Sequence, residues 1–89
     1  MEYFVLGDED TVLGFALVGV AGRVVGDADE ARSAFREVID DGRTGIVVMT
    51  EKTADLIRET VDAYLFTADF PLILEIPDRH GRDPNRPGL

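Results

Sequence analysis

The sequence predicts a small α/β protein, a three-layer sandwich around a four-stranded parallel sheet. Three apolar runs, around residues 2–6, 45–49 and 71–77, end in turn residues or acids and indicate buried strands. Strand and helix patterns alternate along the chain, which is typical of a parallel sheet with helices on both faces. Right-handed crossovers then give strand order 2-1-3-4, a flavodoxin-like (Rossmann-like) arrangement.

The first helix is expected over Thr11–Val20, after the first strand and a turn at Gly7. Asp8 or Asp10 can cap this helix by accepting hydrogen bonds from its free amides. The helix is unusual because no charged residue interrupts it, whereas a surface helix normally keeps one polar face. It is therefore either buried on both sides or completed by a partner. A short second strand, expected over Gly22–Gly26, follows at an edge of the sheet.

The second helix has the clearest boundaries in the sequence. Asp27 is its expected N-cap, and Glu30 stands at the spacing of a capping box. Gly42 is expected to end it. One face collects the apolar side chains Ala31, Ala34, Phe35, Val38 and Ile39.

The third helix is expected to start after Thr50, as its N-cap, and to bury one continuous stripe. That stripe consists of Ala54, Ile57, Val61 and Tyr64, with Arg58, Glu59 and Asp62 facing water. Residues 64–70 are less regular, and Leu65, Phe66 and Phe70 are available for packing. Pro71 opens the fourth strand and Pro77 closes it.

Eighty-nine residues are enough for one domain, which we expect over residues 1–78. Residues 79–89 hold two prolines and two glycines without an apolar period, so a flexible C-terminal tail is expected there.

The composition narrows the possible partners. A net charge of −9 repels nucleic acid and anionic lipid and favours a basic protein surface as the partner. There is no cysteine, and the N-terminus does not resemble a signal peptide. The longest apolar run, 12–22, is about half the ~20 residues that span a bilayer. We therefore expect a cytoplasmic chain that does not insert directly into a membrane.

Acids gather where the carboxyl ends of the first and third strands would meet, the usual ligand crevice of this fold. Asp8 and Asp10 could hold Mg²⁺ in a receiver-like signalling domain or a small-ligand-binding domain. A phosphoacceptor site would also need an aspartate after the third strand, where Thr50 stands, and a lysine after a later strand; Lys52 is the only lysine. The acids are better explained as caps that favour the positive end of a helix dipole.

No other pattern in the sequence assembles an active site. Both common phosphate-binding glycine motifs are missing, and the single histidine, His80, falls in the expected tail. Glu75, inside the fourth strand, suits a structural hydrogen bond or an interface. We expect no catalytic residues, cofactor or metal, and a protein–protein module in which the apolar first helix carries the contact or serves self-association.

Three segments together resemble the F subunits of the V-type and archaeal A-type rotary ATPases. They are G-D-E-D-T-V-L-G-F-A-L-V-G-V at 7–20, G-I-V-V-M-T-E at 45–51 and P-L-I-L-E-I-P at 71–77, in the family's order and spacing. The resemblance implies a non-catalytic central-stalk (rotor) subunit that binds the coiled-coil shaft, the D subunit of these complexes. It also implies a role in coupling ATP hydrolysis or synthesis to ion transport, peripheral to a membrane-bound complex. The candidate interface residues are Leu13, Phe15, Leu17, Thr50, Glu51 and Glu75.

Two departures from the family's pattern bear on function. Family members usually continue after the E-I-P segment into a C-terminal helix that can reach the catalytic head, whereas here the sequence becomes rich in glycine and proline. Regulation of the head is therefore not expected of this chain. Ala16 stands where family members often carry a basic residue, which makes the first helix still more apolar.

Overall fold

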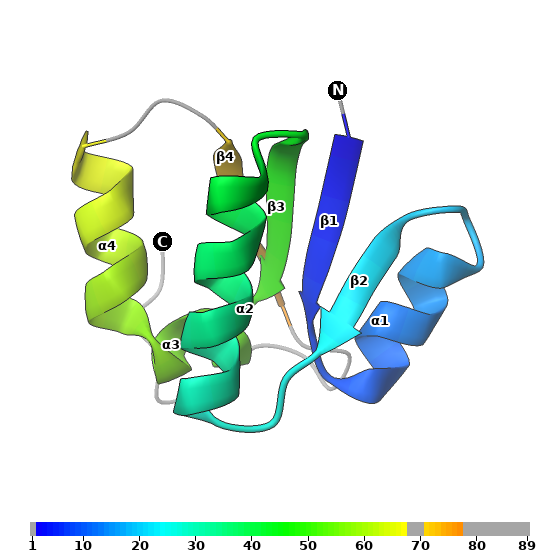
Figure 1. Cartoon of the computed structure of the whole chain (residues 1–89). Helices are drawn as coiled ribbons and strands as arrows, with labels where there is room; N and C mark the ends of the chain where they lie inside the picture. Colours follow the sequence, from blue (N-terminus) through cyan, green and yellow to red (C-terminus); the bar gives the residue numbers. More distant parts are fainter. Residues whose placement is uncertain (1, 68–70, 78–89) are drawn as a thin grey trace.

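A computed structural model describes residues 2–67 and 71–77, and it confirms the predicted fold class and sheet order. Four parallel strands form one sheet in the order β2-β1-β3-β4 (Figure 1). The elements are β1 (Glu2–Gly7), α1 (Glu9–Ala16), β2 (Ala21–Val24), α2 (Ala28–Asp41), β3 (Thr44–Thr50), α3 (Glu51–Leu56), α4 (Arg58–Thr67) and β4 (Leu72–Ile76). The predicted tail at 79–89 and the side chain of Phe70 lie outside the described residues.

The main core lies between the sheet and the helices α2, α3 and α4. Leu6, Val47 and Met49 point from the central strands into this core, because alternate residues of a strand face opposite sides of the sheet. The helices contribute Ala31, Ala34, Phe35, Val38, Ala54, Ile57 and Val61. Phe35 and Tyr64 meet edge to face, with ring centroids 5.6 Å apart, and so join α2 to α4.

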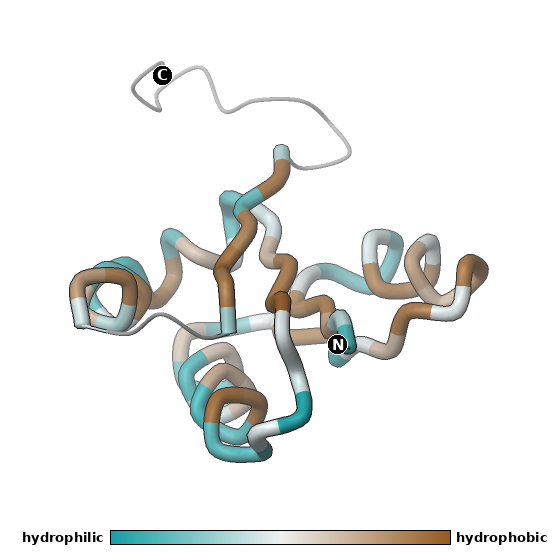
Figure 2. The backbone as a smooth tube through the Cα atoms, turned by 90° about the horizontal axis from the view of Figure 1, so that it is seen from above, coloured by the Kyte–Doolittle hydropathy of each residue, from teal (hydrophilic) through white to brown (hydrophobic). Residues whose placement is uncertain are grey.

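The opposite face of the sheet is covered differently. Val5 and Val48 turn to this side and are buried. Among the described helices α1 alone packs here, over β1 and β2 at one side of the sheet (Figures 1 and 2). Val12 of α1 lies against Gly22 of β2, where a side chain would collide with Val5. The missing side chain of Gly22 therefore lets α1 and β1 approach the edge strand closely.

The first helix is shorter than predicted, ending at Ala16 instead of Val20. Gly19 takes the left-handed conformation (φ 88°), and its amide donates to the carbonyl of Ala16. The amide of Val20 donates to the carbonyl of Phe15, which completes a Schellman motif. Gly19 falls inside the helix predicted from the sequence, whereas in the structure its freedom at positive φ lets the chain leave the helix.

The predicted single third helix is wrong, because the structure divides it into α3 and α4 at Ile57. Ile57 has φ −130° and ψ 39°, outside the helical region, and its side chain is buried. The break also corrects Arg58, which was expected to face water and instead turns toward β4. Leu65 and Phe66 belong to α4 and are exposed, so they do not pack as expected.

The boundaries of α2 are confirmed. Asp27 accepts a hydrogen bond from the amide of Glu30, and Glu30 accepts one from the amide of Gly26, so both side chains satisfy free amides at the start of the helix. Gly42 ends the helix in the left-handed conformation (φ 78°).

Candidate functional site

The most unusual surface of the molecule is the outward side of α1 and the turn that follows it. No residue of α1 is buried, so the reading of a helix buried on both sides is wrong. Leu13, Leu17 and Val18 expose 59%, 84% and 76% of their surface, and we call these three residues the α1 patch. Leu13 and Leu17 are one helical turn apart and therefore neighbours, while Phe15 is half-buried.

The start of α1 is fixed by its own acid. The carboxylate of Asp8 accepts hydrogen bonds from the hydroxyl and the amide of Thr11. The hydroxyl bond from Thr11 is the main cause that lowers the pKa of Asp8, against the opposing effect of partial burial. Asp8 is thus occupied as the N-cap that holds α1 in place.

Stability should therefore depend on pH through Asp8. A folded-state pKa below the unfolded value of about 3.9 stabilises the fold at neutral pH, and this contribution is lost as the pH falls through the folded pKa. We expect the difference in unfolding free energy between the native protein and Asp8→Asn to shrink below about pH 4. Urea unfolding at several pH values measures it.

Thr11→Val supplies the matched variant for this experiment, because it removes the hydroxyl that donates to Asp8. Thr11→Val should reduce the change of the unfolding free energy with pH in the acid range, although the carboxylate of Asp8 remains. If the difference in unfolding free energy between the native protein and Asp8→Asn stayed constant from pH 7 to the acid range, Asp8 would not have the stabilising role assigned to it.

The other predicted site residues lie elsewhere and have structural partners. Thr50 is buried and caps α3, accepting a hydrogen bond from the amide of Thr53 at 3.1 Å. Glu51 is half-buried in the first turn of α3. The structure does not bring these residues onto the α1 patch.

Glu75 faces the opposite side of the sheet from α1 and forms a bidentate pair with Arg58. Both of its carboxylate oxygens accept from the guanidinium at 2.8 Å. The hydrogen bond to Glu75 is the first cause that raises the pKa of Arg58, so the guanidinium stays charged at every accessible pH. Asp55 and Asp62 also contact Arg58, which thereby ties α3, α4 and β4 together.

The receiver-like alternative gains no geometric support. Over residues 2–67 and 71–77, no three acidic, histidine or cysteine side chains gather as metal ligands.

The described residues include no helix that has the length and the apolar character needed to span a membrane.

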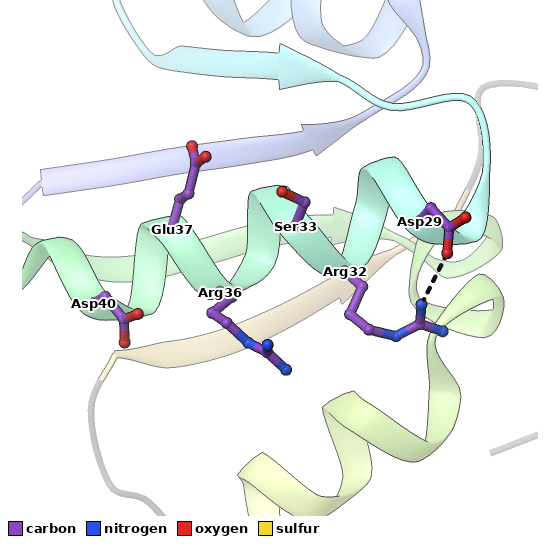
Figure 3. A pocket seen from close by; sticks show the side chains of 6 residues that line it. All are labelled: Asp29, Arg32, Ser33, Arg36, Glu37 and Asp40. Carbon is purple, nitrogen blue, oxygen red and sulfur yellow. Dashed lines mark hydrogen bonds and ion pairs between the residues drawn. The ribbon is translucent and has the colours of Figure 1, made fainter.

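A polar depression of about 380 Å³ runs along the exposed flank of α2 (Figure 3). It is lined by Asp29, Arg32, Ser33, Arg36, Glu37 and Asp40. Arg32 pairs with Asp29 at 3.2 Å, and Glu37 pairs with Arg23 of β2 at 2.8 Å. All these side chains are at least partly exposed, and the flank carries both acids and bases, so it resembles an ordinary solvated helix surface.

Comparison with known proteins adds what the geometry alone does not supply. Residues 4–87 match the model of the family described as ATP synthase (F/14-kDa) subunit. A relative from Methanothermobacter thermautotrophicus, named as the F subunit of an A-type ATP synthase, is 45% identical over 78 residues, covering 86% of this chain and 73% of the relative. A protein of the same name from Pyrococcus furiosus is 36% identical over 86 residues, covering 91% of this chain and 79% of that protein.

Proposed function

Because this chain belongs to the F subunit family of ATP synthases, we propose that it is a non-catalytic component of the central stalk, the rotor of a V/A-type ATPase. In this role it binds the coiled-coil shaft, the D subunit, and helps to couple ATP hydrolysis or synthesis to ion transport. It works on the cytoplasmic side, peripheral to the membrane-bound part of the complex. The shared name of the relatives supports membership of the assembly.

The observation that carries the proposed contact is the exposure of the α1 patch. Leu13, Leu17 and Val18 are large aliphatic side chains that are mostly exposed within six residues of chain, and exposed apolar patches commonly mark protein–protein interfaces. A coiled coil offers a long apolar and charged helical surface that can cover them. Residues 2–22 include acids but no lysine or arginine, which favours a basic stretch of the shaft beside the patch.

Co-expression with the cognate shaft protein, followed by size-exclusion chromatography with mass detection, tests the proposal. We expect a stable one-to-one complex. Separate elution of the two proteins at micromolar concentration would contradict it.

A further inference from the structure

A second apolar surface lies on the same side of the sheet as α1 but toward the other edge. β1, β3 and β4 turn Tyr3, Ile46, Leu72, Leu74 and Ile76 to this side, as the strand register shows. We call these five residues the open half of the sheet. Tyr3, Leu72 and Leu74 expose 51%, 54% and 51% of their surface.

The open half is incomplete by the rules of this architecture. Parallel sheets are normally covered on both faces, and their strands are apolar on both sides for that reason. Among the described helices, α2, α3 and α4 cover one face, whereas α1 packs over β2 and only part of β1 on the other. The side chains of the open half carry no charge, as expected for a surface that receives another layer.

A helix is the element that fits this position. In three-layer sandwiches the covering layer consists of helices, and α1 already lies on this face of the sheet, over β2 and part of β1. The strands β1, β3 and β4 have five to seven residues and are roughly 20 Å long, a length that a helix of about 13 residues spans. Residues 78–89 have two prolines, two glycines and one aliphatic side chain, Leu89, so their sequence supplies no apolar helical stripe.

The charge around the open half indicates the chemistry of that helix. Asp8, Glu9 and Asp10 begin α1 at the carboxyl edge of the sheet, and Glu51 begins α3 at the same edge. The residues of α1, β1 and β4 include no lysine or arginine. A second copy of this chain would bring a net charge of −9 against another −9, which disfavours self-association.

We propose that the open half of the sheet binds an amphipathic α-helix of another protein chain, with an apolar stripe flanked by lysine or arginine. This surface is separate from the α1 patch, and the proposal does not depend on the identity of the shaft protein.

Two designed helical peptides of about 18 residues test the proposal with the full chain. Both carry the same leucine stripe, flanked by lysines in one and by glutamates in the other. The ring signals of Tyr3 and Tyr64 are followed by NMR. Tyr3 lies on the open half, whereas Tyr64 belongs to α4 on the opposite face and donates a hydrogen bond to the carbonyl of Pro71, so it serves as the control. We expect the lysine peptide to shift Tyr3, leave Tyr64 unchanged, and bind at least about tenfold more tightly than the glutamate peptide.

Leu74→Gln and Leu65→Gln form a matched pair, because the two leucines expose 51% and 49% of their surface. Leu74→Gln should lower the affinity for the lysine peptide by roughly fivefold, the loss expected when about half of a leucine side chain is no longer buried on binding. Leu65→Gln should leave this affinity unchanged. No Tyr3 shift at millimolar peptide, equal binding of both peptides, or equal effects of the two variants would overturn the proposal. So would a concentration-dependent dimer that shifts Tyr3 without peptide, because the occupant would then be a second copy.

Discussion

Leu17→Lys is expected to weaken binding to the shaft protein by at least about tenfold while leaving the fold intact. Leu17 exposes 84% of its surface in the free protein, so its substitution removes almost no internal packing. A lysine at the end of α1 also suits the negative end of the helix dipole. Covering a leucine at an interface is worth about 1.5–3 kcal/mol, which corresponds to roughly ten- to a hundredfold in affinity.

Phe66→Lys is the matched control for that variant. Phe66 exposes 91% of its surface but lies on α4, on the other side of the sheet. Calorimetric titration with the shaft protein should separate the two variants, with circular dichroism confirming that both are folded. If Leu17→Lys and the native protein bound the shaft protein with equal affinity, the α1 patch would not be part of the interface.

Gly22→Ala is expected to destabilise the protein by about 3 kcal/mol, toward the upper end of the overpacking range. A β-carbon at Gly22 would stand 2.7 Å from the carbonyl oxygen of Val5 and would also strike the Val5 side chain. The oxygen is part of the backbone of the central strand β1 and cannot rotate away. The change should therefore force β2 or α1 off the sheet and lower the melting temperature by roughly 12 °C or more.

Gly14→Ala makes the same chemical change where there is room. A β-carbon at Gly14 meets nothing within 4 Å, and this residue lies inside α1. Alanine should stabilise the helix by about 0.5–1 kcal/mol, because glycine loses more conformational freedom on folding. Thermal unfolding of both variants checks the pair, and a loss of stability at Gly14 or its absence at Gly22 would contradict the packing described for α1.

Local chemistry explains what the sequence could predict. The apolar runs that became β1, β3 and β4, together with the alternating helices, determine a parallel sheet, and handedness then fixes its order. Caps with a clear signature were also predictable, as Asp27 and Gly42 show for α2. The family resemblance rested on a long pattern across Gly7–Val20, and the comparisons confirm it.

The features that sequence reasoning missed depend on contacts between distant elements or on a conformation that several residues could adopt. The helix breaks at Ile57 without a glycine or proline that would indicate the break in the sequence. The next residue, Arg58, forms an ion pair with Glu75, seventeen residues away. Gly14 and Gly19 look alike in sequence, yet one continues α1 and the other follows its end. The open half of the sheet appears only once the strands are placed side by side, because each strand alone resembles a fully buried one.

The contact between α1 and the shaft is tested most directly by amide hydrogen exchange, compared between the free protein and its complex with the shaft. The amides of residues 13–18 should become slower to exchange in the complex, while those along the polar flank of α2, from Asp29 to Asp40, should not change. Protection confined to α2 and α4, with α1 exchanging as fast as in the free protein, would contradict the proposed binding surface.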